Sequence, residues 1–303
     1  VVSRTYTNKH GETVRLPNSL KGYVDLPYAG TLHPRQRLDL FLPHDPSFKD
    51  PMPAIVCIHG GGWRNGHRSD AVQMAVTQAL TRRYAGVIVG YRRSTEARWP
   101  AQIEDCKMAI RWLKAHAEAF GIDPARIGVF GRSAGGHLAS MLGVSGEVKA
   151  FEGNPSVHPE QSSRVACVVN HCGPSNLLTL NVYSNFVDPI SVESQESGLI
   201  GGTVAERPEA AEDASPLYHI SPDDRPILHV HGTSDRGVPY LQSITFHQAL
   251  RQAGVDSTLI TIRNGKHQFY YHRRMTAVMN RFFEKHLLGM EHRIKDETFD
   301  AAF

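Results

Sequence analysis

The segment 127–139, IGVFGRSAGGHLA, most constrains what this chain can fold into. A short apolar run leads into a Gly-x-Ser-x-Gly turn, and small residues then enter a helical pattern. This order predicts a strand, a sharp turn and a helix. Gly131 and Gly135 fit such a turn because they lack the Cβ atoms that would collide across it. We therefore expect Ser133 at the exposed tip of a parallel sheet, where it is a candidate nucleophile.

Strand and helix patterns alternate on both sides of this turn. Apolar strand patterns lie at 38–42, 54–58, 86–91, 165–170, 226–231 and 258–262. Helical spacing of apolar residues lies at 71–82, 100–120, 240–253 and 275–288. Continuous apolar strands are typical of a parallel sheet that helices cover on both faces. The pattern therefore predicts an α/β fold with a mostly parallel, doubly wound sheet, in which 38–42 is an outer strand and ligands bind at the carboxyl ends of the strands.

Two segments lack a sustained pattern. Residues 1–35 are mixed and polar, and we expect them to wrap the domain. Residues 174–216 hold no apolar strand and break into short pieces around Pro189, Gly198 and Pro208. Stretches of this length usually form lids or binding loops, so we interpret 174–216 as an inserted cap. The whole chain is expected to be a single domain.

Composition argues against several classes of protein. The formal net charge is +3 and no long basic run occurs, so we expect no nucleic-acid partner. No apolar run approaches the roughly 18 residues that a membrane span requires, and we expect a soluble protein. The chain begins at Val1 without a charged and then apolar leader, so we expect that any signal peptide has been removed. The compartment stays open between cytoplasmic and secreted, and a homodimer is one alternative for the oligomeric state.

The four cysteines do not form the framework of a disulfide-rich protein. Cys57 lies in an apolar strand and Cys106 on the apolar face of a helix, so we interpret both as small buried hydrophobic residues. Cys167 and Cys172 flank one predicted strand. Its five steps of about 3.3 Å place them well beyond the roughly 7 Å that a disulfide can span. We therefore expect four free thiols.

A serine hydroxyl becomes a useful nucleophile when a base removes its proton, so Ser133 requires a histidine that a carboxylate orients. Asp235 follows the strand at 226–231, and His267 follows the strand at 258–262. The order Ser, Asp, His along the chain is the order of a catalytic triad on a sheet of this kind. We expect Ser133 to attack, His267 to move the proton and Asp235 to hold the imidazole.

Several residues compete for these roles. Asp223 and Asp224 precede their strand rather than follow it, which places them at the wrong edge of the sheet. His272 is the nearest rival base, but it lies further from a strand end. His229 and His231 share one face of a strand, as two metal ligands would. Because no third ligand has a recognisable spacing, we interpret both as packed residues and expect no metal.

A glycine-rich loop supplies candidate donors for a tetrahedral oxyanion, which preorganised N–H groups must stabilise. The sequence HGGGW at 59–63 follows a predicted strand, and its glycines leave backbone N–H groups open to a ligand. The candidates are the N–H groups of Gly61 and Gly62, together with that of Ala134 at a helix N-terminus, where the helix dipole favours an anion. We expect His59 to hold this loop through a hydrogen bond.

Candidate substrate-binding residues surround these groups. We expect Trp63 and Trp99 near the mouth of the site, where they shape a pocket with the cap. Basic residues near the predicted strand ends are Arg64, Arg92, Arg93, Arg132 and Lys266. They are interpreted either as solvated or paired with Glu104 or Asp105, or as favouring a substrate that carries a carboxylate or a sugar. Arg132 adjoins the candidate nucleophile.

These motifs together resemble the α/β-hydrolase superfamily, and specifically the feruloyl or acetyl-xylan esterase-like branch of the hormone-sensitive-lipase-like carboxylesterases. The resemblance extends from about Leu38 to Leu288. Its landmarks are LDLFLP at 38–43, HGGGW at 59–63, GIDPARI at 121–127, GRSAGG at 131–136 and HGTSDRGVP at 231–239. The chain departs from the family pattern at Arg132, where an acidic or small residue is usual, and at 91–96, where YRRSTE replaces a Tyr-Arg-Leu-x-Pro-Glu run.

The resemblance implies a cofactor-free serine hydrolase that cleaves carboxylic esters through an acyl-enzyme. The expected substrates are small acyl esters, with acetyl or feruloyl groups on carbohydrate as the leading class. An arylformamidase or a peptidase is the alternative, because the same machinery cleaves amides. A hydrolase-fold binding protein without catalysis is a further alternative. The acyl chain, the alcohol and the role of Arg132 stay open at this stage.

Overall fold

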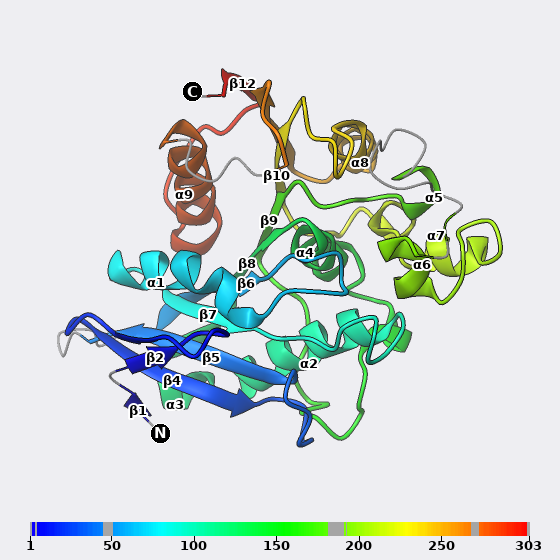
Figure 1. Cartoon of the computed structure of the whole chain (residues 1–303). Helices are drawn as coiled ribbons and strands as arrows, with labels where there is room; N and C mark the ends of the chain where they lie inside the picture. The colour runs from blue at the N-terminus through cyan, green and yellow to red at the C-terminus, as the bar shows by residue number, and fades with distance from the viewer. Residues whose placement is uncertain are drawn as a thin grey trace.

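The computed structural model describes residues 2–3, 5–44, 51–180, 191, 193–267 and 273–301. A ten-stranded sheet forms its centre (Figure 1). From one edge to the other, its strands are β1 (Val2–Ser3), β4 (Leu20–Pro27), β5 (Arg37–Pro43), β7 (Ala85–Val89), β6 (Met52–Ile58), β8 (Ile122–Arg132), β9 (Cys167–His171), β10 (Ile227–Gly232), β11 (Ser257–Arg263) and β12 (Glu297–Asp300). Pairing is antiparallel from β1 to β7 in this order and parallel from β7 to β12. The predicted mostly parallel sheet is confirmed.

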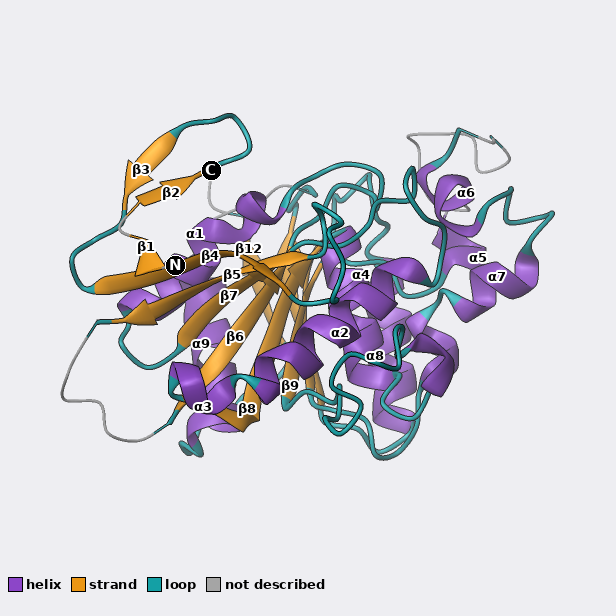
Figure 2. Cartoon of the chain, turned by 90° about the horizontal axis from the view of Figure 1, so that it is seen from below, coloured by secondary structure: helices purple, strands orange, loops and turns teal. Residues whose placement is uncertain are grey.

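Helices cover both faces of the sheet (Figure 2). They are α1 (Val72–Leu80), α2 (Ala101–Ala115), α3 (Ala117–Phe120), α4 (Ala134–Val144), α5 (Leu177–Leu180), α6 (Gln195–Ile200), α7 (Pro208–Asp213), α8 (Leu241–Gln252) and α9 (Arg273–Leu288). One face carries α1 and α9, and the other carries α2, α4 and α8. A separate hairpin of β2 (Thr5–Thr7) and β3 (Thr13–Arg15) lies near the N-terminus.

The central strand β6 separates two hydrophobic cores. Val56 belongs to the cluster that contains Leu138 of α4. Its neighbours Ile55 and Cys57 belong to the cluster that contains Phe283 of α9. Successive side chains of a strand point to opposite faces, so a strand between two helical layers must be apolar at every position. This requirement explains why residues 54–58 form a continuous apolar run.

The N-terminal edge of the sheet differs from the sequence prediction. The strand expected at the outside, 38–42, lies third from the edge within β5, because β4 pairs with β5 and β1 pairs with β4. The register of β4 shifts between Tyr23 and Leu26, where Asp25 has a φ of 59°. A register shift interrupts the alternation of side chains between the two faces. The sequence of β4 therefore carries no regular strand signal.

The predicted helix at 100–120 is divided in the structure. It ends as α2 near His116 and continues as α3, which closes at Gly121 in the left-handed conformation, with a φ of 64°. Glycine is favoured there because a Cβ atom strains that conformation. The strand that leads to Ser133 begins directly afterwards, so β8 extends back to Ile122, beyond the apolar run from which it was predicted.

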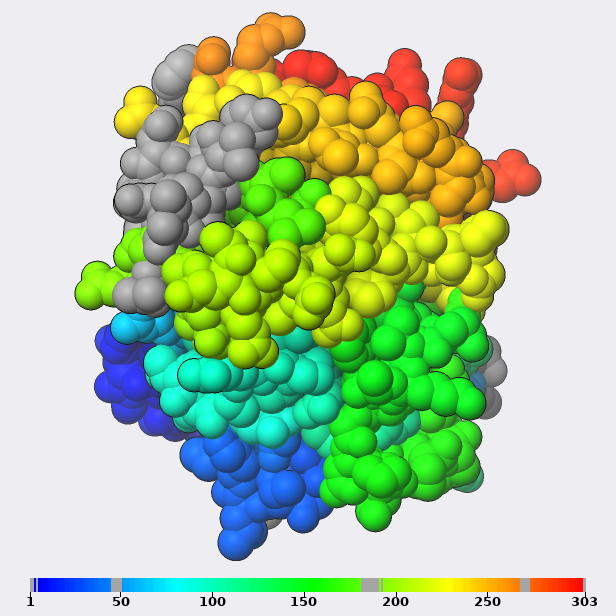
Figure 3. Space-filling view, turned by 90° about the vertical axis from the view of Figure 1, so that its right-hand side faces the viewer, coloured from blue at the N-terminus to red at the C-terminus, as the bar shows by residue number. Residues whose placement is uncertain are grey.

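The segment predicted as a cap contains the short helices α5, α6 and α7, and its described residues form no strand. Pro189 lies outside the described residues, as do 181–188, 190 and 192. Trp99 N donates a hydrogen bond of 2.9 Å to the Leu199 carbonyl of α6, which joins this segment to the loop before α2. Figure 3 shows the yellow-green surface of α6 and α7 on one face of the molecule. Its action as a cap stays a prediction.

The cysteines agree with a further expectation. Cys57, Cys106, Cys167 and Cys172 are all buried free thiols, as predicted. Among the described helices, none combines the length and the apolar character that crossing a membrane requires.

Buried histidines predict acid sensitivity of the fold. Burial lowers the pKa of His59 and His137 to about 4 and that of His229 to about 3. A histidine in the unfolded chain has a pKa of about 6.5, so the unfolded state binds more protons below that pH. Stability is therefore fully present above pH 6.5 and is lost as the pH falls. Between pH 6.5 and 5, each such imidazole removes about 2 kcal/mol from the free energy of unfolding.

Urea denaturation at pH 5 to 7 measures this loss, and His229→Phe should reduce the pH dependence by one imidazole's share. Both ring nitrogens of His229 lack a hydrogen-bond partner among the described residues, so an apolar ring can replace it. Exposed His10 offers a control, since His10→Gln should leave the slope unchanged. A His229→Phe slope equal to that of the wild type would contradict the assignment.

Candidate active site

The backbone at Ser133 forms a strained turn between β8 and α4. Ser133 has a φ of 55° and a ψ of −125°, a conformation that L-residues rarely adopt. A Cβ atom on Gly131 would lie 2.0 Å from the Gly135 carbonyl oxygen, and one on Gly135 would lie 2.2 Å from the Ile58 carbonyl oxygen. The two glycines are therefore required by close backbone contact. Ser133 N donates to the His171 carbonyl at 2.9 Å, which ties the turn to β9.

The structure brings the three residues predicted as a triad into one hydrogen-bonded chain. The Ser133 hydroxyl lies 3.0 Å from His267 Nε2, and His267 Nδ1 lies 2.7 Å from Asp235 Oδ2. Ser133 follows β8, His267 follows β11 and Asp235 follows β10. These strands run parallel and end at the same edge of the sheet. This geometry suits transfer of the serine proton to Nε2 while the carboxylate holds the opposite side of the ring.

The Asp235 carboxylate is buried and accepts hydrogen bonds on both oxygens. Oδ1 accepts from the backbone N–H groups of Gly237 at 2.8 Å and Val238 at 2.9 Å. Oδ2 accepts from His267 and lies 3.2 Å from His231 Nε2. Burial raises the pKa of Asp235, but the hydrogen bonds from His231 and His267 outweigh it and hold the pKa well below its usual range. The carboxylate is therefore ionised at neutral pH.

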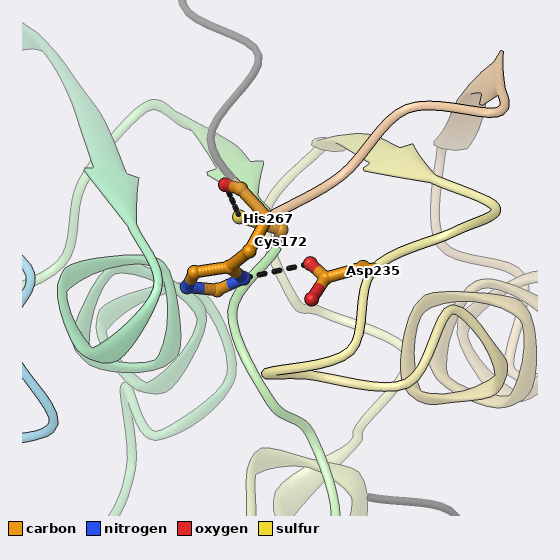
Figure 4. A group of neighbouring side chains, drawn as sticks. All are labelled: Cys172, Asp235 and His267. Atoms are coloured by element: carbon orange, nitrogen blue, oxygen red, sulfur yellow. Dashed lines mark hydrogen bonds and ion pairs between the residues drawn. The ribbon is translucent and has the colours of Figure 1, made fainter. Parts of the chain in front are cut away.

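The pKa of His267 shifts in the opposite direction. Burial lowers its pKa, but its hydrogen bond to Asp235 and its proximity to Cys172 raise the pKa above the ordinary value of 6.5. The protonated ring is thus stabilised, as a group that briefly holds the serine proton requires. Figure 4 shows the His267 ring directed at Asp235, with Cys172, just after the end of β9, beside His267.

Cys172 lies next to His267 and Asp235, a contact that the sequence did not predict. Its thiol donates to the His267 carbonyl oxygen at 3.7 Å. Polar atoms of Cys172, Asp235 and His267 lie within 4.8 Å of one another. Within this group, His267 Nδ1 and Asp235 Oδ2 are already joined by a hydrogen bond of 2.7 Å. The sequence signal that could have predicted this contact is position. Cys172 comes just after a strand, as Asp235 and His267 do.

The glycine loop lies against the nucleophile. A Cβ atom on Gly60 would lie 3.3 Å from the Ser133 Cβ. Gly61 and Gly62 have φ angles of 115° and 56°, which glycine adopts without strain. Among the described residues, none accepts a hydrogen bond from the N–H groups of Gly61, Gly62 or Ala134. These N–H groups beside Ser133 are therefore left without a described acceptor, and the Gln195 side chain packs against Gly62.

His59 holds this loop, as expected. Its Nδ1 donates to the Gly60 carbonyl at 2.7 Å, and its ring stacks on Tyr91 with centroids 4.3 Å apart. The Tyr91 hydroxyl donates in turn to the His59 carbonyl at 3.0 Å. Because burial lowers the pKa of His59 to about 4, the ring is neutral at physiological pH. Its contacts with Gly60 and Tyr91 support the glycine loop.

The two candidate pocket tryptophans link the glycine loop to the predicted cap. Trp63 is buried, and its indole N–H donates to His137 Nδ1 at 3.1 Å. The other nitrogen of His137 donates to the Ala214 carbonyl, just after α7. Trp99 is half-buried and donates to the Asp213 carboxylate at 2.7 Å. Direct contact of either indole with substrate stays a prediction.

The basic residues around the site differ in their surroundings. Arg92 pairs with Glu104 at 3.1 Å and with buried Asp105 at 2.8 Å, so the interpretation of internal pairing is confirmed for this arginine. Arg132 is half-buried beside Ser133 and contributes to lowering the pKa of His171. The two exposed members are Arg64 and Lys266. A substrate-binding role for Arg132 stays a prediction.

Three of the rivals, Asp223, Asp224 and His229, lie apart from the hydrogen-bonded chain. His231, which was interpreted as a packed residue, instead lies 3.2 Å from Asp235 Oδ2. Asp223 pairs with Arg164, and Asp224 accepts from Ser221, in the loop before β10. His229 packs against Phe246 inside the molecule. His272 lies outside the described residues.

Comparison with known proteins places the chain in a family. The BD-FAE family model matches residues 38–250. The chain belongs to the BD-FAE family. Among solved structures similar to this BD-FAE chain, a truncated carbohydrate esterase from gut microbiota has a TM-score of 0.81 and 30% identity, covering 88% of this chain and 96% of that one. A bifunctional GH43-CE protein of Bacteroides eggerthii has a TM-score of 0.80 and 32% identity, covering 88% of this chain and 35% of that one.

The curated relatives of this BD-FAE chain include ester hydrolases. The probable carboxylic ester hydrolase LipM of Mycobacterium tuberculosis is 30% identical over 71% of this chain and 48% of its own length. Esterase LipC of the same organism is 30% identical over 72% of this chain and 53% of its own length. The chain thus spans about half the length of the curated relatives it matches. The α/β-hydrolase fold and the resemblance to hormone-sensitive-lipase-like carboxylesterases are confirmed.

The pKa of His267 predicts how catalysis depends on pH. A base acts when it is neutral, so a pKa raised above 6.5 places the acid limb of kcat/KM above pH 6.5. Asp235→Asn removes the anion that raises this pKa and disturbs the orientation of the ring. We expect the limb to move to lower pH and kcat to fall about 10³- to 10⁴-fold.

Hydrolysis of p-nitrophenyl acetate between pH 5 and 9 measures both effects. Asp223→Asn is the matched control, because that carboxylate is exposed, lies before β10 and should change neither kcat nor the limb. An Asp235→Asn enzyme with the wild-type rate and limb would remove Asp235 from the account.

Proposed function

We propose that this chain is a serine carboxylesterase that hydrolyses small acyl esters through an acyl-enzyme. The observation that carries the proposal is the hydrogen-bonded chain from Ser133 through His267 to Asp235, beside a glycine loop whose N–H groups at Gly61 and Gly62 have no acceptor among the described residues. The ester hydrolases and esterases among its relatives support this reaction class.

The residues divide the reaction into two similar halves. His267 Nε2 takes the proton of Ser133 as Oγ attacks the ester carbonyl, and Asp235 stabilises the imidazolium that forms. The oxyanion accepts hydrogen bonds from the N–H groups of Gly61, Gly62 and Ala134, and one such donor typically contributes about 10²- to 10³-fold in rate. The tetrahedral intermediate expels the alcohol, which takes the proton from His267. Water then attacks the acyl-enzyme with the same proton transfers and releases the carboxylic acid.

The proposed substrates are acetyl or feruloyl esters of carbohydrate. Two similar solved structures, at 30% and 32% identity, are described as a carbohydrate esterase and a bifunctional GH43-CE protein. In this proposal, the cap at 174–216 with Trp63 and Trp99 shapes the pocket for the acyl group or the sugar, and Arg132 contributes positive charge beside the nucleophile.

Replacing Ser133 with Ala tests the reaction directly. The variant keeps the fold but lacks the atom that forms the acyl-enzyme, so hydrolysis of p-nitrophenyl acetate should fall at least about 10⁴-fold. Ser156→Ala, in an exposed loop, is the matched control and should retain the wild-type rate. Wild-type hydrolysis by Ser133→Ala would refute the proposed mechanism.

The same assay on four further substrates separates the candidate substrate classes. We expect higher kcat/KM for acetylated xylo-oligosaccharide or methyl ferulate than for N-formylkynurenine or a peptide p-nitroanilide. The reverse order would favour an amide hydrolase.

A further inference from the structure

Two buried histidines on β10 have very different surroundings. His229 and His231 lie two residues apart, so their side chains point to the same face of the sheet, and both are fully buried. The ring of His229 contacts Phe246 and His247, and neither of its nitrogens has a hydrogen-bond partner among the described residues. By contrast, both ring nitrogens of His231 lie within hydrogen-bonding distance of polar atoms. Burial alone therefore does not explain His231.

Hydrogen bonds fix which nitrogen of His231 carries the proton. Nε2 lies 2.9 Å from the Val238 carbonyl oxygen and 3.2 Å from Asp235 Oδ2, and both of these atoms are acceptors. Nε2 must therefore carry a hydrogen. When the ring carries this one hydrogen, Nδ1 is free to accept from the Ser243 hydroxyl, which lies 2.7 Å away. Ser243 is itself fully buried in α8.

The Oδ2 atom of Asp235 consequently lies between two imidazoles. His267 donates to it from the active-site side, at 2.7 Å, and His231 approaches from the interior, at 3.2 Å. With the two backbone N–H groups on Oδ1, four N–H groups face one carboxylate, and the N–H group of His231 is shared with the Val238 carbonyl. The carboxylate can neither rotate nor turn away from His267 without losing one of them.

We propose that His231 is a positioning residue of the proposed esterase, which acts through Asp235 and is itself oriented by Ser243. It holds the carboxylate in the plane that His267 requires. It also takes part of the negative charge of Oδ2, which limits how strongly Asp235 raises the basicity of His267. This inference rests on the proposed function, because its effects are read from ester hydrolysis.

In the described part of the chain, other titratable or charged groups lie near the rings of His231 and His267. Cys172 and His171 lie at the end of β9, and Arg132 lies at the end of β8. Tyr240, before α8, contacts the ring of His231, with centroids 5.7 Å apart. The variants below leave all four unchanged, so a shift of the pH profile is attributable to His231.

The variant His231→Phe keeps a ring in the same space and removes the donor. Hydrogen bonds to charged groups contribute enough that we expect kcat to fall about 10- to 100-fold. KM should stay unchanged, because His231 does not contact substrate. Removing the second donor concentrates the charge of Oδ2 on His267, so the acid limb of kcat/KM should move to higher pH. A merely structural role would not move this limb.

Three further variants control the result. His229→Phe makes the same substitution two residues earlier, and it should leave kcat and the limb unchanged. His231→Gln restores an N–H donor and should recover part of kcat. Ser243→Ala removes the donor to Nδ1 and allows the other tautomer, whose Nε2 lone pair would face the carboxylate, so we expect a smaller fall in kcat. If His231→Phe fails to fold, the acid limb of kcat/KM is measured in His231→Gln and Ser243→Ala instead.

A readout independent of turnover separates this inference from the proposed function. The proton shared by His267 Nδ1 and Asp235 should give a downfield NMR resonance, and it should move in His231→Phe but not in His229→Phe. Wild-type protein without esterase activity would refute the proposed function and leave this resonance to be read. Active wild-type protein, with His231→Phe equal to it in kcat, acid limb and resonance, would overturn the inference.

Discussion

Parallel pairing of β8, β9, β10 and β11 is the constraint on which the site depends. In a parallel sheet the carboxyl ends of neighbouring strands lie at one edge, so side chains far apart in sequence meet there. Ser133 follows β8, Asp235 follows β10 and His267 follows β11, at hydrogen-bonding distances of 3.0 and 2.7 Å. The intervening strand β9 contributes the His171 carbonyl, which holds the Ser133 backbone, and the thiol of Cys172. A change in strand register would separate these groups.

Close backbone packing supports that constraint. The turn at Ser133 approaches the end of β6 so closely that Gly135 has no room for a side chain. The same approach sets the glycine loop against the nucleophile, where the N–H groups of Gly61 and Gly62 have no acceptor among the described residues. His59 and Tyr91 hold the base of the loop through hydrogen bonds and ring stacking. Nucleophile and oxyanion donors are thus parts of one packed unit.

Residues with strong local signals were predictable from the sequence. The apolar run at 54–58 identified a strand buried on both faces, and the glycines around Ser133 identified the turn, because each pattern has one physical cause. The strand β4, second from the edge of the sheet, was not predictable, since its register shift removes the alternation of side chains. The contact of His231 with Asp235 was also hidden, because a buried histidine in a strand has the same sequence signal whether it packs, as His229 does, or donates.

Labelling with a fluorophosphonate probe tests the central claim most directly, because this reagent reacts with serines that a neighbouring base activates. Mass spectrometry of the labelled protein should locate one adduct on Ser133. Labelling should be absent in Ser133→Ala and much slower in His267→Gln, since the latter lacks the base that lies 3.0 Å from the hydroxyl. Active protein that carries no adduct on Ser133, or an adduct on a different serine, would contradict the account.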